Sequence, residues 1–430
     1  MQAHTRRDFL KKAAVGAATL GYAGSAKAVG ANEKVVVGLI GCGGRGQTVA
    51  QQMGGVAYVC DPDEHRLAAT ARRLGVDSSK AVTDLRRILD DDAVDAVIIA
   101  TPDHWHTPAA LLACEAGKHV YVEKPSSHNF RESRLLVNAA RRYDRVVQHG
   151  TQSRSSELVV GAVQMLRDGI IGDVLVAKAW NVQRRRNIGH HRPTDPPPGV
   201  DYDTWVGPAE FVPYQENRFH YSWHWWYNFG TGDVGNDGVH EIDYALWGLG
   251  VETLPSKVSG SGTKLFFDDD QEFPDTATLT FDYPADGKIG SKRQLIFEMR
   301  IWSPNSPYDT DNGVEFYGTG GKMFLSKQGR LEILDDDNRT IEAKPESQPD
   351  LLSHQDDFTD AIRTGRRPNA DIEIGHLAVG VVHLGNIVCR LGRPVDFDPV
   401  AERIVADPAA NRLLRRKYRK GGHWAVPKGV

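Results

Sequence analysis

A glycine-rich turn between an apolar strand and a helix constrains the fold of this chain more than any other sequence feature. Residues 34–40 form an almost unbroken apolar run, typical of a strand buried in a parallel sheet. The turn G-C-G-G-R-G at 41–46 follows at once and leads into a helical segment. In this context G-x-G-x-x-G indicates a dinucleotide-binding domain with the pyrophosphate at the helix N-terminus. We expect Gly41 to allow the tight turn, Gly43 to admit the pyrophosphate and Gly46 to let helix and strand pack closely.

An acidic residue at the end of a second apolar strand indicates which dinucleotide binds. Residues 56–60 form this strand, and Asp61 follows it, 20 residues after Gly41. A carboxylate here accepts hydrogen bonds from the adenosine ribose hydroxyls and repels a 2′-phosphate. We therefore expect NAD. The nearby Arg45 and Arg66 could compensate for a phosphate, which leaves NADP as the less favoured alternative.

Two further strands end in polar segments. The buried strand at 93–100 leads into T-P-D-H-W-H at 101–106, and the strand at 119–122 leads into E-K-P at 123–125. In an open parallel sheet the ligand lies beyond the carboxyl ends of the strands. Both segments are therefore expected to face the cofactor.

These motifs together resemble the Gfo/Idh/MocA oxidoreductase family. The resemblance rests on the glycine turn, the acid at the second strand end, A-T-P-x-x-x-H at 100–106 and G-K-H-V-x-x-E-K-P at 117–125. It implies an NAD(P)-dependent enzyme acting on sugars, inositols or related polyols. It also implies that Lys124 touches both the nicotinamide ribose and a substrate hydroxyl, and that the bond to the following proline is often cis. Asp103 stands where the family often has Asn, so a cofactor contact is expected to differ here.

The fold that this resemblance implies is α/β, with an N-terminal Rossmann doubly wound parallel sheet and a C-terminal α/β domain with a large, mostly antiparallel open sheet. The expected cofactor site comprises Gly41, Gly43, Gly44, Arg45, Gly46, Asp61, Thr101, Pro102, His106, Glu123, Lys124 and Gln152.

A second motif supplies candidate catalytic residues. The family's D-x-G-x-H-x-x-D places its histidine on His240, its last acid on Asp243 and its first acid on Asn236. Asparagine cannot accept a proton, but it can orient a sugar hydroxyl. Residues four apart share one helical face, so Asn236 and His240 are expected to point at one substrate carbon. We predict Lys124, His240 and Asn236 as catalytic residues, with either Lys124 or His240 taking the proton, and Asp243 as a substrate contact.

A run of tryptophans precedes this motif. Trp223, Trp225 and Trp226 are expected to form a wall on which a sugar ring stacks, although core packing is the alternative for most of the chain's nine tryptophans. His220 and His224 have a spacing compatible with a metal site, but no further ligand set is visible, so we expect no metal.

The N-terminus resembles an export signal. T-R-R-D-F-L-K at 5–11 is similar to the twin-arginine signal of bacteria, and A-K-A at 26–28 offers a cleavage site. The alternative is a basic helix that stays on the protein. The twin-arginine route carries folded proteins, so we expect a periplasmic or otherwise exported enzyme that holds its cofactor tightly.

Composition bounds the remaining possibilities. Lys plus Arg number 52 and Asp plus Glu 56, which argues against a nucleic-acid partner. No apolar run reaches the ~18–20 residues of a membrane span.

The expected division is 1–28 signal peptide, 34–152 NAD-binding Rossmann domain, 153–398 substrate-binding and oligomerisation domain, and 399–430 solvated tail. An Arg- and Pro-rich loop in the second domain is either a solvated linker or a cover over the active site. One face of the C-terminal sheet is expected to pack in a homodimer or tetramer.

Three functions fit the sequence. The first is hydride transfer between a sugar or polyol hydroxyl carbon and a tightly bound nicotinamide cofactor. The second is glycoside cleavage, in which transient oxidation at C3 acidifies the C2 proton and allows elimination. The third is a non-catalytic sugar-binding protein, supported only by Asn236.

Overall fold

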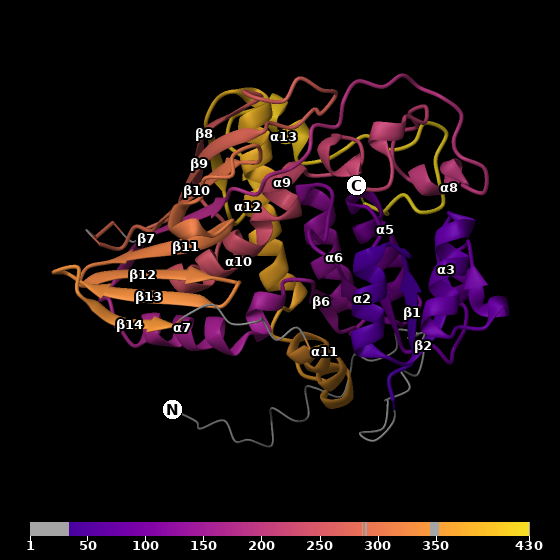
Figure 1. Cartoon of the computed structure of the whole chain (residues 1–430), viewed down its shortest axis with the longest axis horizontal. Helices are drawn as coiled ribbons and strands as arrows, with labels where there is room; N and C mark the ends of the chain where they lie inside the picture. The colour runs from indigo at the N-terminus through magenta and orange to yellow at the C-terminus, as the bar shows by residue number, and fades with distance from the viewer. Residues whose placement is uncertain (1–33, 286, 289, 345–351, 430) are drawn as a thin grey trace, which may run out of the picture.

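Two β-sheets form the frames of an N-terminal and a C-terminal half (Figure 1). The computed structural model describes residues 34–285, 287–288, 290–344 and 352–429. The expected export signal at 1–28 lies outside these residues.

The N-terminal half contains a parallel sheet of six strands in the order β3-β2-β1-β4-β5-β6. Its strands are β1 (Val37–Ile40), β2 (Val56–Cys60), β3 (Ala81–Val82), β4 (Ala96–Ile99), β5 (His119–Val122) and β6 (Val147–His149). The helices between them are α2 (Gly44–Met53), α3 (Glu64–Leu74), α4 (Arg86–Leu89), α5 (Asp103–Glu115) and α6 (Phe130–Arg142). The strand order reverses beside β1, where the connections diverge and leave a crevice. This is the doubly wound sheet that the sequence predicts.

Local sequence explains why these elements form. All residues of β1 and β4 are buried, as a parallel sheet covered by helices requires. Helix α3 begins after Asp63, whose carboxylate accepts hydrogen bonds from the backbone N–H groups of His65 and Arg66. It ends at Gly75, which adopts the left-handed region with φ of 67°.

The C-terminal half contains a ten-stranded sheet in the order β14-β13-β12-β11-β7-β10-β9-β8-β15-β16. The strands are β7 (Val174–Asn181), β8 (Lys257–Thr263), β9 (Thr276–Asp282), β10 (Gln294–Arg300), β11 (Asn312–Gly318), β12 (Gly321–Ser326), β13 (Arg330–Asp335), β14 (Thr340–Lys344), β15 (Val395–Asp398) and β16 (Arg403–Ile404). Strands β7 and β10 pair in parallel, and the other described pairs in this sheet are antiparallel. The expected fold class is confirmed.

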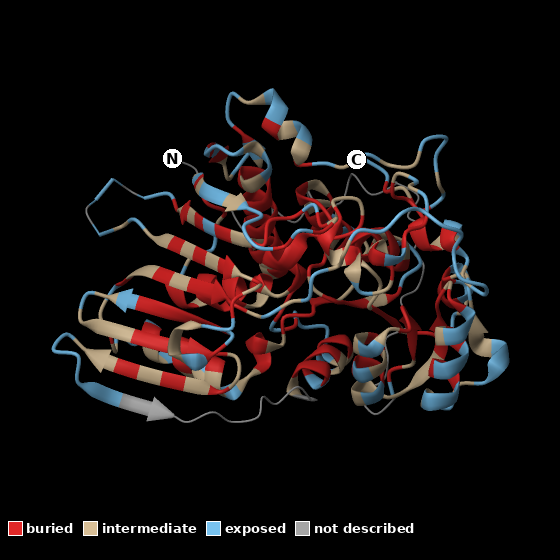
Figure 2. Cartoon of the chain, turned by 45° about the horizontal axis from the view of Figure 1, so that its top comes forward, coloured by how far each residue is buried: buried red, intermediate tan, exposed pale blue. Residues whose placement is uncertain are grey.

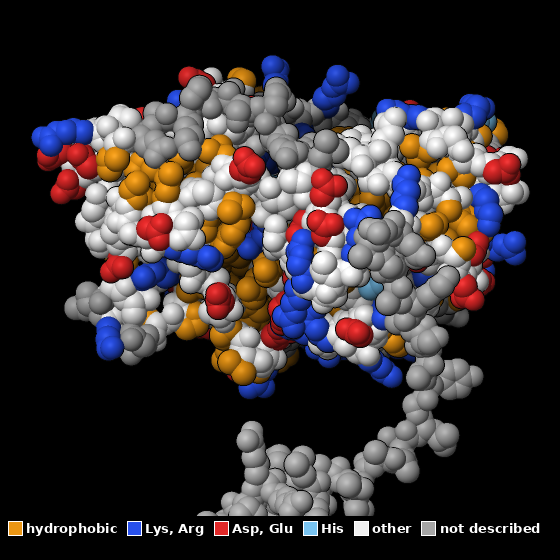
Figure 3. All heavy atoms as spheres, turned by 90° about the horizontal axis from the view of Figure 1, so that it is seen from below, with side chains coloured by type: hydrophobic (Ala, Val, Ile, Leu, Met, Phe, Trp, Pro, Cys, Tyr) orange, Lys and Arg blue, Asp and Glu red, His pale blue; other side chains and the backbone are white. Residues whose placement is uncertain are grey.

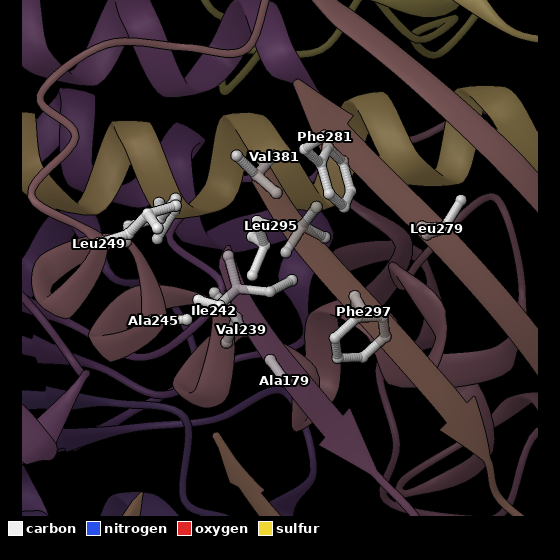
Figure 4. Close-up of a cluster of buried hydrophobic side chains, with 14 of the residues drawn as sticks. Ala179, Val239, Ile242, Ala245, Leu249, Leu279, Phe281, Leu295, Phe297 and Val381 are labelled. Carbon is white, nitrogen blue, oxygen red and sulfur yellow. The ribbon is translucent and has the colours of Figure 1, made fainter. Parts of the chain in front are cut away.

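Helices α7 (Glu157–Arg167), α10 (Gly238–Leu249) and α12 (Ile372–Leu391) pack in the core of this half. Alternate residues of the strands are buried, which gives the banded strands of Figure 2. Phe281 and Leu295 are opposite each other on β9 and β10, and they point toward Ile242 and Val381 of the helices (Figure 4). Among the described residues, α12 is the one helix long and apolar enough for a membrane span, and most of it is buried in this core.

Charged side chains of both signs are spread over the surface. Seen from below, Lys and Arg lie among Asp and Glu, with apolar side chains visible between them (Figure 3). This distribution agrees with the near balance of 52 basic and 56 acidic residues in the sequence.

A long connection between β7 and α9 (Gly232–Asn236) reaches the N-terminal half. It contains the short helix α8 (Tyr202–Val206) and a buried aromatic cluster that includes Trp205, Phe219 and Phe229. The carbonyl oxygen of Trp205 accepts a hydrogen bond from the indole N–H of Trp105 at 2.9 Å. This part of the connection is therefore packed against α5. The Arg- and Pro-rich loop before it is exposed at residues 190–199, which agrees with a solvated linker there.

The C-terminal residues differ from the expected solvated tail. They form β16 and α13 (Pro408–Leu413), and the chain then runs beside α8 and α5 (Figure 1). Arg416 is buried and pairs with Glu132 of α6 at 2.7 Å. The tail prediction is wrong here because the basic stretch contains an arginine whose partner lies almost 300 residues away in sequence. Elsewhere, α11 (Leu352–Thr364) packs on α2.

Candidate active site

A cleft of about 740 Å³ lies at the carboxyl ends of the parallel strands, between the two halves. Its lining includes the ends of β1, β2, β4 and β5, residues of the long connection, and Asn236 of α9. Of the predicted cofactor residues, those that line it are Gly41, Gly43, Gly44, Arg45, Asp61, Thr101, Pro102, His106, Glu123 and Lys124. The structure brings these residues together. Gly46 and Gln152 lie behind the lining.

The glycine turn has the geometry of a pyrophosphate cradle. Gly41 has φ of 97°, and a Cβ there would lie 2.5 Å from the carbonyl oxygen of Ala100. A Cβ on Gly46 would lie 2.3 Å from the carbonyl oxygen of Gly41. By contrast, a Cβ on Gly43 meets only a side-chain atom of Arg66 at 3.7 Å, and Gly44 has open space around it. Gly41 and Gly46 thus permit the close turn, while the open side at Gly43 and Gly44 fits a pyrophosphate.

Asp61 is held rigidly at the end of β2. Its Oδ2 accepts a hydrogen bond from the backbone N–H of Cys42 at 2.8 Å, and its Oδ1 accepts one from that of Asp63 at 2.9 Å. Burial raises the pKa of this carboxyl, and the two backbone bonds oppose the shift. Each oxygen has further lone-pair capacity, so the carboxyl is placed to accept ribose hydroxyls.

Glu123 and Arg45 form an ion pair on the cleft wall. Arg45 Nε lies 2.6 Å from Glu123 Oε1. Burial alone would raise the pKa of Glu123, but the positive charges of Arg45 and Lys124 outweigh it and lower that pKa. The amide of Gln152 donates to the Tyr121 hydroxyl at 3.1 Å, and that hydroxyl donates to Glu123 at 3.3 Å. Gln152 therefore supports the wall from behind.

His106 joins the ends of two strands. Its Nδ1 lies 2.5 Å from the carbonyl oxygen of Pro125 and its Nε2 lies 2.8 Å from that of Thr101. Burial lowers the pKa of the imidazole. The side chain thus ties the segment after β4 to the segment after β5, in addition to lining the cleft.

Lys124 connects the two halves at the inner part of the cleft. The Lys124–Pro125 bond is cis, as the family resemblance implies. The lysine Nζ donates to the backbone carbonyl of Asn236 and lies 3.2 Å from the Asn236 side-chain oxygen. An ammonium group and an amide oxygen therefore converge where a substrate hydroxyl could bind to both.

The side chain of Asn236 is oriented by a carboxylate. Its Nδ2 donates to Asp233 Oδ1 at 2.8 Å, which turns its oxygen toward Lys124. Asp233 is completely buried and pairs with Arg185 at 3.1 Å. The acid that the family motif would place at 236 is thus found one helical turn earlier, behind the amide.

His240 does not share a helical face with Asn236. Helix α9 ends at Asn236, and the intervening Asp237 has a non-helical backbone (φ −120°, ψ −42°) before α10 begins. Lys327 lies 2.8 Å from Asp237 and anchors this break. The half-buried His240 is not among the cleft-lining residues. Burial, together with the charges of Lys327 and Lys124, holds its pKa well below the usual value, so the imidazole is neutral at pH 7.

Of the four residues predicted to contact the substrate, one lines the cleft and three are buried away from it. Trp223 lines the cleft. Trp225 is buried in the main core of the C-terminal half, and Trp226 is buried in the aromatic cluster with its indole N–H on the Asn217 carbonyl. Asp243 is fully buried and pairs with Arg154 at 2.9 Å, so it supports the fold and not the substrate. These side chains lie away from the cleft because helical and loop packing, which sequence spacing does not reveal, turns them inward.

Sequence reasoning missed several cleft residues. They are aromatic, histidine or hydroxyl side chains from α5, the long connection and the C-terminus: Trp105, Thr204, Trp205, His220, Tyr221, His224 and Trp424. The run H-Y-S-W-H at 220–224 carried a usable signal, because aromatic and histidine side chains concentrate there. No comparable sequence signal pointed to Lys327 or Arg185. Within the described residues no group of three His, Cys, Asp or Glu side chains could hold a metal ion.

The cleft therefore combines a dinucleotide cradle with the ammonium of Lys124 and the amide of Asn236, which defines an NAD-binding oxidoreductase. Two family models agree: one described as oxidoreductase family, NAD-binding Rossmann fold, matches residues 35–151, and one described as oxidoreductase family, C-terminal alpha/beta domain, matches residues 178–425. The chain belongs to the Gfo/Idh/MocA oxidoreductase family, and NAD is its cofactor.

Individual proteins show which members of the family this chain resembles. The chain is 26% identical to scyllo-inositol 2-dehydrogenase (NAD(+)) of Bacillus subtilis (strain 168), over 80% of this chain and 90% of the relative. It is 31% identical to a glycosyl hydrolase family 109 protein of Saccharopolyspora erythraea, over 40% of this chain and 44% of that protein. A solved levoglucosan dehydrogenase in complex with NADH has the same fold, with a TM-score of 0.64 and 19% identity over 85% of this chain and 99% of that one.

Proposed function

We propose that this protein oxidises a hydroxyl carbon of a sugar or polyol, with NAD as the hydride acceptor. The observation that carries the proposal is the junction of Lys124 with Asn236, where a donor and an acceptor from the two halves meet inside the cleft. The similarity to an inositol dehydrogenase over most of both chains supports a polyhydroxylated substrate.

The roles of the residues follow from their charges. When bound, NAD supplies the hydride acceptor at C4 of its nicotinamide ring. Lys124 donates to the substrate oxygen and stabilises the negative charge that develops there. Asn236 accepts a hydrogen bond from the same or a neighbouring hydroxyl. We assign proton uptake to His240, which is neutral and, because it lies outside the cleft lining, acts through water.

Substitution of the junction tests these roles. Lys124→Met and His240→Gln should retain the fold and still bind NAD, but reduce turnover by ~10²–10⁴, the range for general acid–base groups. His65→Gln, which changes an exposed histidine outside the cleft lining, is the matched control for His240→Gln. Near-normal turnover of both variants on the true substrate would refute the assignment.

Glycoside cleavage by transient oxidation remains a second candidate because of the glycosyl hydrolase family 109 relative. A panel of free sugars, polyols and aryl glycosides in deuterium oxide separates the two. Stoichiometric NADH with a keto sugar or lactone, or reduction of a second sugar, supports the oxidoreductase. Aglycone release with deuterium at C2 and no net NADH would establish the alternative. Binding of sugars with no reaction in any arm would indicate the sugar-binding protein.

We further propose export through the twin-arginine route, based on the motif at 5–11. Free NAD is scarce outside the cytoplasm, so the cofactor would travel inside the folded protein and be recycled in place. Mass analysis of nucleotide in protein recovered from the periplasm tests this. Protein found only in the cytoplasm, or recovered from the periplasm without nucleotide, would contradict it.

We also propose a homodimer or tetramer that packs through the outer face of the ten-stranded sheet. Tyr317, on β11 at this sheet, is 37% exposed although it is a large aromatic side chain. Light scattering of the purified protein should give a mass of two or four chains. A monomer at micromolar concentration would refute the proposal.

A further inference from the structure

Residues 415–429, here called the C-terminal strap, are fixed to the N-terminal half by a buried charge. The guanidinium of Arg416 is 7% exposed and pairs with Glu132, which is fully buried, at 2.7 Å. It also donates to the backbone carbonyl of His104 at 2.8 Å, and the Tyr418 hydroxyl donates to the same Glu132 oxygen at 2.7 Å. A buried pair of this kind holds firmly, because separating it leaves an uncompensated charge.

Two further residues of the strap hold it, one to the long connection and one to the N-terminal half. Arg419 pairs with Asp203 of the long connection at 2.9 Å, and its backbone N–H donates to Pro208 at 3.0 Å. Farther along, Ala425 is only 2% exposed and is part of the apolar core of the N-terminal half. The strap therefore bridges the parallel-sheet domain and the long connection.

Between these anchors, Trp424 remains open to the cleft. Its side chain lines the cleft and is 41% exposed, which is unusual for the largest apolar side chain between anchored neighbours. Its ring lies 5.8 Å from that of Trp105, and the guanidinium of Arg86 lies 4.4 Å from its centre. Together with Leu85, these side chains form a recess in the cleft that combines two indole rings and an apolar side chain with one guanidinium group.

The strand order places this recess at the adenosine side. Arg86 follows β3, and β3 pairs with β2, whose end holds Asp61. Lys124 follows β5, on the opposite side of β1 in the sheet. Asp61 is the ribose acceptor, so the base attached to that ribose lies near the recess.

We propose that Trp424 binds the adenine ring of NAD by stacking, and that the strap thereby retains the dinucleotide. An indole presents a wide π face with one polar edge, and stacking on such a face suits a purine. The inference rests on NAD binding and not on the identity of the sugar, so its test is independent of the substrate panel.

Binding of nucleotide fragments tests the proposal. Full-length protein freed of nucleotide is titrated calorimetrically with AMP, nicotinamide mononucleotide and NAD. Trp424→Leu removes the ring but keeps an apolar side chain, and it should weaken AMP and NAD binding about 5- to 100-fold, the usual range for base stacking. Nicotinamide mononucleotide should bind within twofold of the unaltered protein. Trp424→Phe should recover most of the affinity, and NAD should dissociate from Trp424→Leu faster by a similar factor.

The matched control is Trp302→Leu. Trp302 is also partly exposed and stacks on an aromatic ring, Phe266, but it does not line the cleft. This variant should bind all three ligands normally. Unchanged AMP affinity in Trp424→Leu would overturn the proposal. Equal weakening of AMP and nicotinamide mononucleotide would also overturn it, because Trp424 would then support the fold and not the base.

Discussion

Replacing Asp103 by asparagine should raise the free energy of unfolding at neutral and alkaline pH. Asp103 begins α5 and is 1% exposed. Its Oδ2 accepts the Thr231 hydroxyl from the other half at 2.7 Å, while its Oδ1 is buried and has no hydrogen-bond partner among the described residues. Burial raises the pKa of this carboxyl to about 7, although the Thr231 bond and the charge of Lys124 act in the opposite direction.

The size of the effect follows from the two pKa values. An unfolded aspartate has a pKa of about 3.9, so the folded protein binds this proton more tightly than the unfolded chain. Stability from this group is therefore greatest below pH 4 and declines as the pH rises toward 7. With about 1.4 kcal/mol for each pKa unit, the cost reaches about 4 kcal/mol at pH 8. Asparagine keeps an acceptor for Thr231 and does not titrate.

Urea unfolding followed by tryptophan fluorescence measures the difference. The gain of Asp103→Asn over the unaltered protein should be about 2.6 kcal/mol larger at pH 8 than at pH 5. Asp195→Asn changes an exposed carboxylate and should show no such trend. A difference between Asp103→Asn and the unaltered protein that stays constant from pH 5 to 8 would refute the assignment of a shifted pKa to this carboxyl.

Four other substitutions separate folding from binding. Arg154→Ala leaves the buried Asp243 carboxylate unpaired and should lower the free energy of unfolding by about 3–5 kcal/mol in urea titrations, with NAD affinity per folded molecule unchanged. Gly46→Ala should fail to give soluble folded protein because its Cβ meets a carbonyl oxygen at 2.3 Å, whereas Gly44→Ala should fold with normal circular dichroism and bind NAD more weakly. Asp61→Ala should weaken NAD binding by about 1–3 kcal/mol in calorimetry, and stronger binding of NADP than of NAD by the unaltered protein would contradict its role.

The parallel sheet could be predicted because its signals are local. The apolar run before Gly41, the glycine spacing and Asp61 lie within one strand–helix–strand unit, and the same steric demands recur in the structure. The start of the helix after β4 could not be predicted from such local signals. The helix begins at Asp103, within the 101–106 segment that was expected to face the cofactor, because His104 and Trp105 make tertiary contacts that favour burial and helix over loop.

The parts of the cleft that lie outside the parallel sheet depend on contacts that are distant in sequence. Trp424 reaches the cleft only because Arg416 is paired with Glu132, and a local pattern of basic residues predicts a solvated tail. For the tryptophan run the prediction fails in the opposite direction. Trp225 and Trp226 were expected to face a sugar ring, but packing buries both side chains in hydrophobic clusters. Sequence spacing predicts which side chains are near one another, but not which of them face the cleft.

The charges behind the Lys124–Asn236 junction, where we propose that the reaction takes place, explain why asparagine suits position 236. Three cations and three acids meet there: Lys124, Arg185, Lys327, Asp233, Asp237 and Glu241. Burial already raises the pKa of Glu241 to about 7, so the cations do not fully stabilise the carboxylates present. A fourth carboxylate at 236 would lie beside Asp233, which is 2.8 Å from the present amide, and like charges at this distance destabilise each other. It would also pair with Lys124 and compete with the substrate oxygen. The amide keeps Lys124 in place through hydrogen bonds and leaves its charge for the reaction.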